Sequence, residues 1–153
     1  MIAAQTGIQM QHIAYKGSAP GLVDLAAGQT QSMTDTINTA LPYIRDGRLR
    51  AIAVTSLKRS SVLPDVPSLH EAGLTGFDAA AWQGIVVPTG TPAEIISRLN
   101  AEVNKALGSD LRQRLVDQGY ELSPASSEDF AKFQREDIAR SAKIVADAKI
   151  KAE

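Results

Sequence analysis

The chain has 153 residues, of which 44% are hydrophobic and 22% charged, and its formal net charge is -1. These values are typical of an ordinary globular protein with one domain or two small lobes, and scattered basic residues with few aromatics argue against nucleic-acid binding. Cysteine is absent, which excludes disulfides, thiolate metal sites and a cysteine nucleophile. No apolar stretch approaches the roughly 18 residues that a membrane span requires.

The first residues predict the last turn of a helix, closed by Gly7. They contain neither a basic region nor a long apolar core, so they do not predict a signal peptide, and the chain as written is expected to stay in the cytoplasm. Residues 8–14 predict a strand that places His12 in a packed position. A helix is then expected to open near Ser18–Pro20 and to end at Gly28, a typical residue after a helix C-terminus.

The middle of the chain alternates short apolar runs with helical signals. Residues 31–36 and 49–55 predict strands, and residues 39–46 predict a helix ended by Gly47, with Pro42 tolerated only in its first turn. Residues 56–77 predict polar loops and a short helical turn that carries a solvated His70. Residues 79–87 predict a further strand.

The last third is expected to be mostly helical. Thr91, Pro92 and Glu94 form a capping pattern for a helix that continues to Leu107. A short helix over 109–118 and a brief strand over 120–122 follow. Ser126 is expected to cap a final helix that ends near Ala148. Helices that alternate with short apolar strands predict an α/β fold with a mostly parallel sheet flanked by helices.

The most informative stretch is the turn between Tyr15 and the helix that follows. Small residues let a ligand approach the backbone, and the first N–H groups of a helix have no partner within it. This arrangement suits a carboxylate or phosphate. Lys16 is either an anion-binding or Schiff-base residue or a solvated lysine, and the two interpretations weigh equally.

Other candidates carry weaker signals. His12 and Lys16 are the residues on which a small α/β enzyme would depend, yet phosphate-loop, dinucleotide-binding and nucleophile-elbow motifs are all absent. Asp35 and Thr36 end a predicted strand, where ligands gather in parallel sheets. Equally, Thr36 or Asn38 simply caps the next helix.

An ordered set of short motifs resembles the Bug-type solute-binding receptors of tripartite tricarboxylate transporters. The motifs are Tyr15-Lys16-Gly17, Asp24-Leu25, Leu41-Pro42, residues 47–55, Leu63-Pro64-Asp65-Val66-Pro67, Glu71-Ala72-Gly73, Trp82-Gln83-Gly84 and Gly90-Thr91-Pro92. The resemblance implies a periplasmic receptor with two α/β lobes of the type II binding-protein fold that close over a small carboxylate. Family members are roughly twice as long, so the fold is expected to be incomplete, a carboxyl-terminal half without the first-lobe loop.

The resemblance also implies a division of the chain and a site. Residues 8–55 form a second-lobe unit with the ligand loop, residues 56–90 a crossover loop and hinge strands, and residues 91–153 a helical part of the first lobe. The implied partners are a small carboxylate and the membrane components of the transporter, without cofactor, metal or catalytic residues. Uncovered first-lobe helices are expected to favour homo-oligomers, and a non-binding oligomerising fragment stays an alternative. The implied ligand residues are Tyr15, Lys16, Gly17, Ser18 and Ala19, with Asp35 and Thr36.

Overall fold

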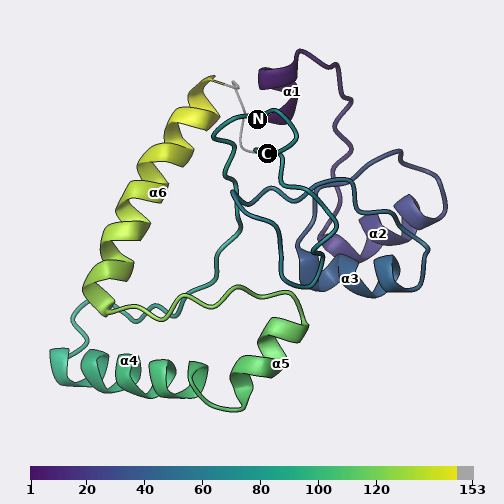
Figure 1. Cartoon of the computed structure of the whole chain (residues 1–153). Coiled ribbons are helices and arrows are strands. Elements are labelled where there is room, and N and C mark those ends of the chain that lie inside the picture. Colours follow the sequence, from purple (N-terminus) through teal and green to yellow (C-terminus); the bar gives the residue numbers. More distant parts are fainter. Residues whose placement is uncertain (148–153) are drawn as a thin grey trace. The chain divides into compact units, whose positions relative to one another are not determined.

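The structure is a computed structural model that describes residues 1–147. Its described residues contain six helices (Figure 1) and divide into two compact units. Unit 1 comprises Met1–His12, Val86–Leu107 and the described residues from Ser123 on, and unit 2 comprises Ile13–Ile85 and Gly108–Leu122. The helices are α1 (Ile2–Thr6), α2 (Ser18–Ala26), α3 (Ile37–Arg45), α4 (Ala93–Leu107), α5 (Leu111–Asp117) and α6 (Ser127–Asp147).

Local signals placed most helix ends correctly. Gly7 follows α1 with φ 73°, and Gly28 and Gly119 follow α2 and α5 with φ 76° and 88°. Before α6, the Ser126 hydroxyl accepts the Asp129 N–H at 3.0 Å and donates to the Asp129 carboxylate at 2.7 Å. This reciprocal pair satisfies a backbone donor that the helix itself leaves unpaired. The predicted end of the last helix at Ala148 lies outside the described residues.

Helix α3 differs from its prediction. It begins at Ile37, two residues earlier than expected, with Thr36 as its N-cap residue. Pro42 therefore lies in the second turn, and the prediction that it fits only in the first turn was wrong. A proline there removes one backbone hydrogen bond of the helix. Burial of Leu41, which is only 3% exposed, offsets this loss by packing the helix against the core.

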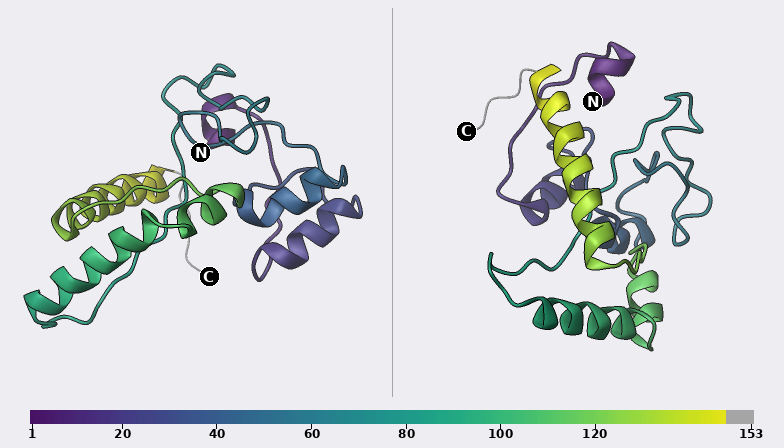
Figure 2. Two further views of the ribbon diagram at one scale, coloured as in Figure 1. Left: turned by 60° about the horizontal axis from the view of Figure 1, so that its bottom comes forward. Right: turned by 90° about the vertical axis from the view of Figure 1, so that its left-hand side faces the viewer.

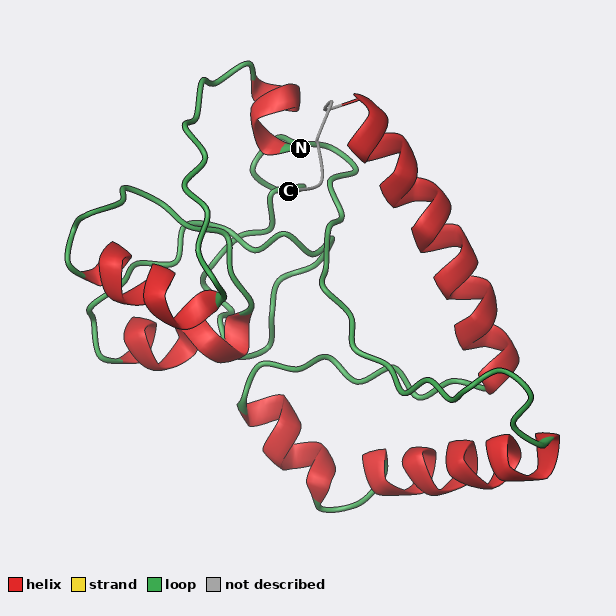
Figure 3. Ribbon diagram, turned by 180° about the vertical axis from the view of Figure 1, so that it is seen from behind, coloured by secondary structure: helices red, strands yellow, loops and turns green. Residues whose placement is uncertain are grey.

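The predicted sheet is not formed within the described residues, where helices are joined by loops (Figure 3). The segments expected as strands, residues 8–14, 31–36, 49–55, 79–87 and 120–122, contain a single isolated parallel bridge between Val54 and Ser68. Around it, the Val54 N–H donates to the Pro67 carbonyl, and the Val54 carbonyl accepts the Leu69 N–H. The Ala79 N–H donates to the Thr55 carbonyl at 2.9 Å. A strand needs a hydrogen-bonded neighbour, and outside this point the apolar runs have none in the described part of the chain.

Unit 2 holds the core. Leu22, Leu41, Val54 and Phe77 are the buried hydrophobic residues, each at most 6% exposed. Helix α2 packs against α3, side by side in Figure 1. The residues after α5 join them, because the Asn38 amide donates to the Tyr120 hydroxyl at 3.0 Å.

An ion pair organises the loop over residues 56–77. Arg59 donates to both Glu71 carboxylate oxygens and to the Pro64 carbonyl. The Ser68 N–H donates to Glu71 at 2.8 Å, and the Glu71 N–H returns a bond to the Ser68 hydroxyl. These hydrogen bonds lower the pKa of Glu71 below 4.5. The bond from the Ser68 N–H has the larger effect, and the bond from Arg59 comes next. Residues 68–72 form a single helical turn, as predicted, because the Ala72 N–H donates to the Ser68 carbonyl at 3.0 Å, and Gly73 follows it with φ 110°.

Unit 1 is built differently. Helices α4 and α6 contact each other (Figure 2), and Asn100 and Asn104 on α4 both donate to the Ala125 carbonyl just before α6. No side chain described in this unit is buried. Polar links, rather than an apolar core, therefore hold its two long helices together.

Candidate functional site

The turn before α2 depends on an unusual backbone conformation. Gly17 is the N-cap residue of α2 with φ 101° and ψ 176°. Residues other than glycine rarely adopt this backbone conformation. No side chain caps the helix, and the structure gives the N–H groups of Ser18 and Ala19 no partner among the described residues. Pro20 has no N–H to satisfy. Two free backbone donors therefore lie at the positive end of the helix dipole.

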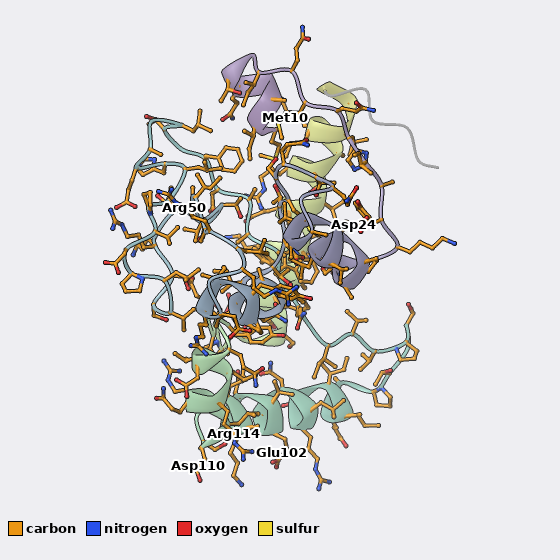
Figure 4. All side chains as sticks on the ribbon, turned by 90° about the vertical axis from the view of Figure 1, so that its right-hand side faces the viewer. Met10, Asp24, Arg50, Glu102, Asp110 and Arg114 are labelled. Carbon is orange, nitrogen blue, oxygen red and sulfur yellow. The ribbon has the colours of Figure 1, made fainter. Side chains whose placement is uncertain are left out.

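Tyr15 does not direct its hydroxyl toward this turn. Its phenol donates a hydrogen bond of 2.8 Å to the carboxylate of Asp24, which lies near the C-terminal end of α2 and is labelled in Figure 4. This bond, followed by partial burial and the negative charge of Asp24, raises the pKa of the Tyr15 phenol above 10.0. The ring lies against Gly21, whose added Cβ would be 3.4 Å from Tyr15 Cδ2.

Asp35 joins the first turns of two helices. Its carboxylate accepts the Ser18 hydroxyl at 2.6 Å and the Thr39 hydroxyl at 2.8 Å. The Thr36 hydroxyl lies 2.9 Å from that of Thr39. The structure thus brings Ser18, Asp35 and Thr36 together at the N-terminal turns of α2 and α3.

Four of the predicted ligand residues are exposed. Lys16, Gly17, Ala19 and Thr36 face solvent, and Lys16 has no ion pair within the described part of the chain. An exposed amine lacks the desolvation that activates a nucleophilic lysine. It can supply a positive charge beside the free N–H groups.

The two histidines differ from their predictions. His12 is exposed rather than packed, which corrects its prediction. His70 is half-buried rather than solvated, because its Nδ1 accepts the Gly76 N–H at 2.9 Å. No cluster of three or more His, Asp or Glu residues suited to a metal ion occurs among residues 1–147.

Sequence reasoning missed two residues of this arrangement. Asp24 carries only a family motif in the sequence, since no local rule pairs a helical aspartate with a tyrosine nine residues before it. Thr39 follows Asp35 by four residues and Thr36 by three. Such spacing at a helix start is a signal for side-chain hydrogen bonding.

A family model described as "Tripartite tricarboxylate transporter family receptor" matches residues 1–150. The chain belongs to this family. Membership confirms the resemblance to Bug-type receptors drawn from the sequence motifs.

Similar proteins support the assignment. A "UPF0065 protein in tcbD-tcbE intergenic region" of a Pseudomonas species is 35% identical over 99% of this chain and 46% of its own length. A related protein of Pseudomonas knackmussii is 36% identical over 84% of the chain and 77% of its own length. "Protein BugT" of Bordetella pertussis is 40% identical over 69% of the chain and 32% of its own length.

Solved structures agree on the fold. "R. palustris Rpa4515 with adipate" is 36% identical with a TM-score of 0.90, covering 97% of this chain and 50% of that one. MatC from Rhodopseudomonas palustris with bound malate is 34% identical with a TM-score of 0.80, covering 94% and 50%. The chain spans about half of each of these structures. It therefore follows the periplasmic binding-protein fold and covers that fold incompletely, as predicted.

Proposed function

We propose that this chain forms one side of a receptor site for a small carboxylate, without catalysis. The observation that carries the proposal is the start of α2, where the free N–H groups of Ser18 and Ala19 lie beside the exposed Lys16. Adipate and malate, named with two similar structures, belong to the class of small carboxylates that the proposal assigns to this loop. The proposed ligand residues are Tyr15 to Ala19, with Asp35 and Thr36.

The proposed context is that of the family. The receptor would act in the periplasm and deliver its ligand to the membrane components of a tripartite tricarboxylate transporter. In this proposal residues 8–55 belong to the second lobe, residues 56–90 to the crossover and hinge, and residues 91–153 to the first lobe. Among the described residues no helix is both long and apolar enough to cross a bilayer.

Titration of the ¹⁵N-labelled chain with adipate and malate tests the site. We expect the amide signals of residues 17–19 to move at millimolar ligand, because binding by one lobe lacks the contacts made on closure. Lys16→Gln is expected to weaken the response severalfold, whereas Lys58→Gln, an exposed lysine elsewhere in unit 2, leaves it unchanged.

Two results would contradict the proposal. If millimolar carboxylate leaves the amides of residues 17–19 unmoved, the site is not at this loop. If calorimetry with a carboxylate panel gives tight, specific binding by the chain alone, the site is complete and not one side of a larger one.

Self-association is the expected behaviour of the purified chain. Many large apolar side chains are exposed on the unpaired segments and long helices, including Ile8, Met10, Ile85, Val86, Ile95, Phe133 and Ile138. Exposed apolar area of this extent favours oligomers. Size-exclusion chromatography with light scattering is expected to show species larger than 16.3 kDa, and a stable monomer at all concentrations would refute this.

A further inference from the structure

The two long helices of unit 1 expose apolar side chains that their own unit does not cover. We infer that these side chains form a docking face for a second polypeptide, the part of the family fold that this chain does not span. The inference is independent of the proposed ligand, because the docking face belongs to unit 1 and the ligand loop to unit 2.

Unit 1 has amphipathic helices but no core. None of its described side chains is buried, whereas the four buried hydrophobic residues of the described chain all belong to unit 2. Two hydrogen bonds to the Ala125 carbonyl join α4 to the segment before α6. Such bonds contribute little net stability, and ordering a helix costs conformational entropy that apolar burial must offset. Unit 1 therefore lacks the contribution that keeps an ordinary domain folded.

The uncovered apolar residues of α4 share one side of the helix. Ile95 and Leu99 are 50% and 43% exposed, and residues four apart are neighbours on a helix surface. The charged residues Glu94, Arg98 and Lys105 recur at the same helical spacing on a separate side. The exposed apolar side of α4 is thus a continuous feature of the helix.

Helix α6 carries a matching set of side chains. Phe130 and Phe133 stack with ring centroids 6.5 Å apart, and Phe133 is still 42% exposed. Ile138 and Val145 lie seven residues apart, on one side of α6, and are 60% and 45% exposed. Helix α4 contacts α6 without covering them. Apolar side chains gathered on two contacting helices indicate an interaction surface.

A similar structure indicates what occupies this face. R. palustris Rpa4515 matches 97% of this chain with a TM-score of 0.90, so the match includes unit 1. The same match takes up 50% of the Rpa4515 chain. The rest of that chain is therefore as long again as the matched part, and it belongs to the same molecule. A second copy of the present chain would offer only another set of the same uncovered helices.

Hydrogen exchange of the chain alone tests whether unit 1 lacks a core. We expect the amides of α2 and α3 to exchange at least about 100-fold more slowly than those of α4 and α6, because protection follows local stability. A dilution series removes any protection that self-association gives. Equal protection of the four helices at every concentration would overturn the inference, since unit 1 would then be stable without a partner.

Adding the proposed partner is the second test. The part of Rpa4515 outside the match is co-expressed with this chain, and in a second protein it is joined to the chain by a flexible linker. We expect a one-to-one complex, or a monomer of the linked protein, in which α4 and α6 become protected and α2 and α3 change little. The linked protein decides the outcome where the separate part does not fold. Unprotected α4 and α6 in the linked protein would overturn the proposal.

Matched substitutions locate the face on α4. Leu99→Asp in the linked protein is expected to lower the protection of α4 and α6 at least about tenfold, because an unpaired charge is costly to bury. Arg98→Asp, on the charged side of the same helix, is the control and is expected to retain the protection. In both variants, protection of α2 reports that unit 2 is intact.

Two outcomes would assign the face differently. Equal effects of Leu99→Asp and Arg98→Asp would show that this side of α4 is not the contact. A homodimer of the chain that protects α4 and α6 and excludes the added part of Rpa4515 would make a second copy the occupant. Either result overturns the inference and leaves the proposed carboxylate site untouched.

Discussion

Replacing Phe77 by alanine is expected to lower the free energy of unfolding of unit 2 by about 3–5 kcal/mol. Phe77 is 3% exposed and is the largest of the four buried hydrophobic residues. Domains of ordinary size are stable by only about 5–15 kcal/mol, and a core of four residues leaves little reserve. We therefore expect the variant to be largely unfolded at 37 °C.

Thermal and urea unfolding followed by circular dichroism measures this effect. Ile52→Ala is the matched control, because Ile52 is 76% exposed and its truncation is expected to change stability by less than about 0.5 kcal/mol. If the two variants unfold alike, Phe77 does not anchor the core that the structure describes.

Replacing Gly17 by alanine is expected to abolish the response to carboxylates. The φ of 101° and ψ of 176° cost a residue with a side chain about 1–3 kcal/mol. The first turn of α2 is expected to shift to an allowed conformation, which moves the Ser18 and Ala19 N–H groups. An added Cβ meets nothing within 4 Å, so the effect comes from the backbone alone.

A stability loss at Gly17 would not by itself identify a ligand site, since the backbone requires glycine there in any case. Gly28→Ala is the matched variant, with a positive φ of 76° and open space around the Cβ at the other end of α2. We expect both variants to lower the unfolding midpoint and only Gly17→Ala to lose the amide response to malate. Retained binding in Gly17→Ala would place the ligand elsewhere.

Helix ends were predictable because their signals are local. Gly7, Gly28 and Gly119 adopt positive φ values, and Ser126 caps α6 within four residues of sequence. Such features need only near neighbours along the chain. Helix α3 was misplaced because burial of Leu41 outweighed the preference of Pro42 for a first turn.

The strands and the site's internal bonds were not predictable in this way. An apolar run such as residues 49–55 shows that a segment can be a strand, but its partner decides whether a ladder forms, and here only Val54 meets one. The contacts of Tyr15 with Asp24 and of Ser18 with Asp35 join residues nine and 17 positions apart. Neither distance is set by a local rule.

The sequence alone determined the helices, the glycine at the start of α2 and the family, because each follows from residues close together or from an ordered set of motifs. Tertiary structure decided where the hydroxyls of the predicted ligand residues donate. The sequence predicted Tyr15 and Ser18 as ligand residues, and in the structure their hydroxyls donate to Asp24 and Asp35. The reason is physical: a hydroxyl has one proton and donates one hydrogen bond, and in the folded chain a nearby charged acceptor receives it.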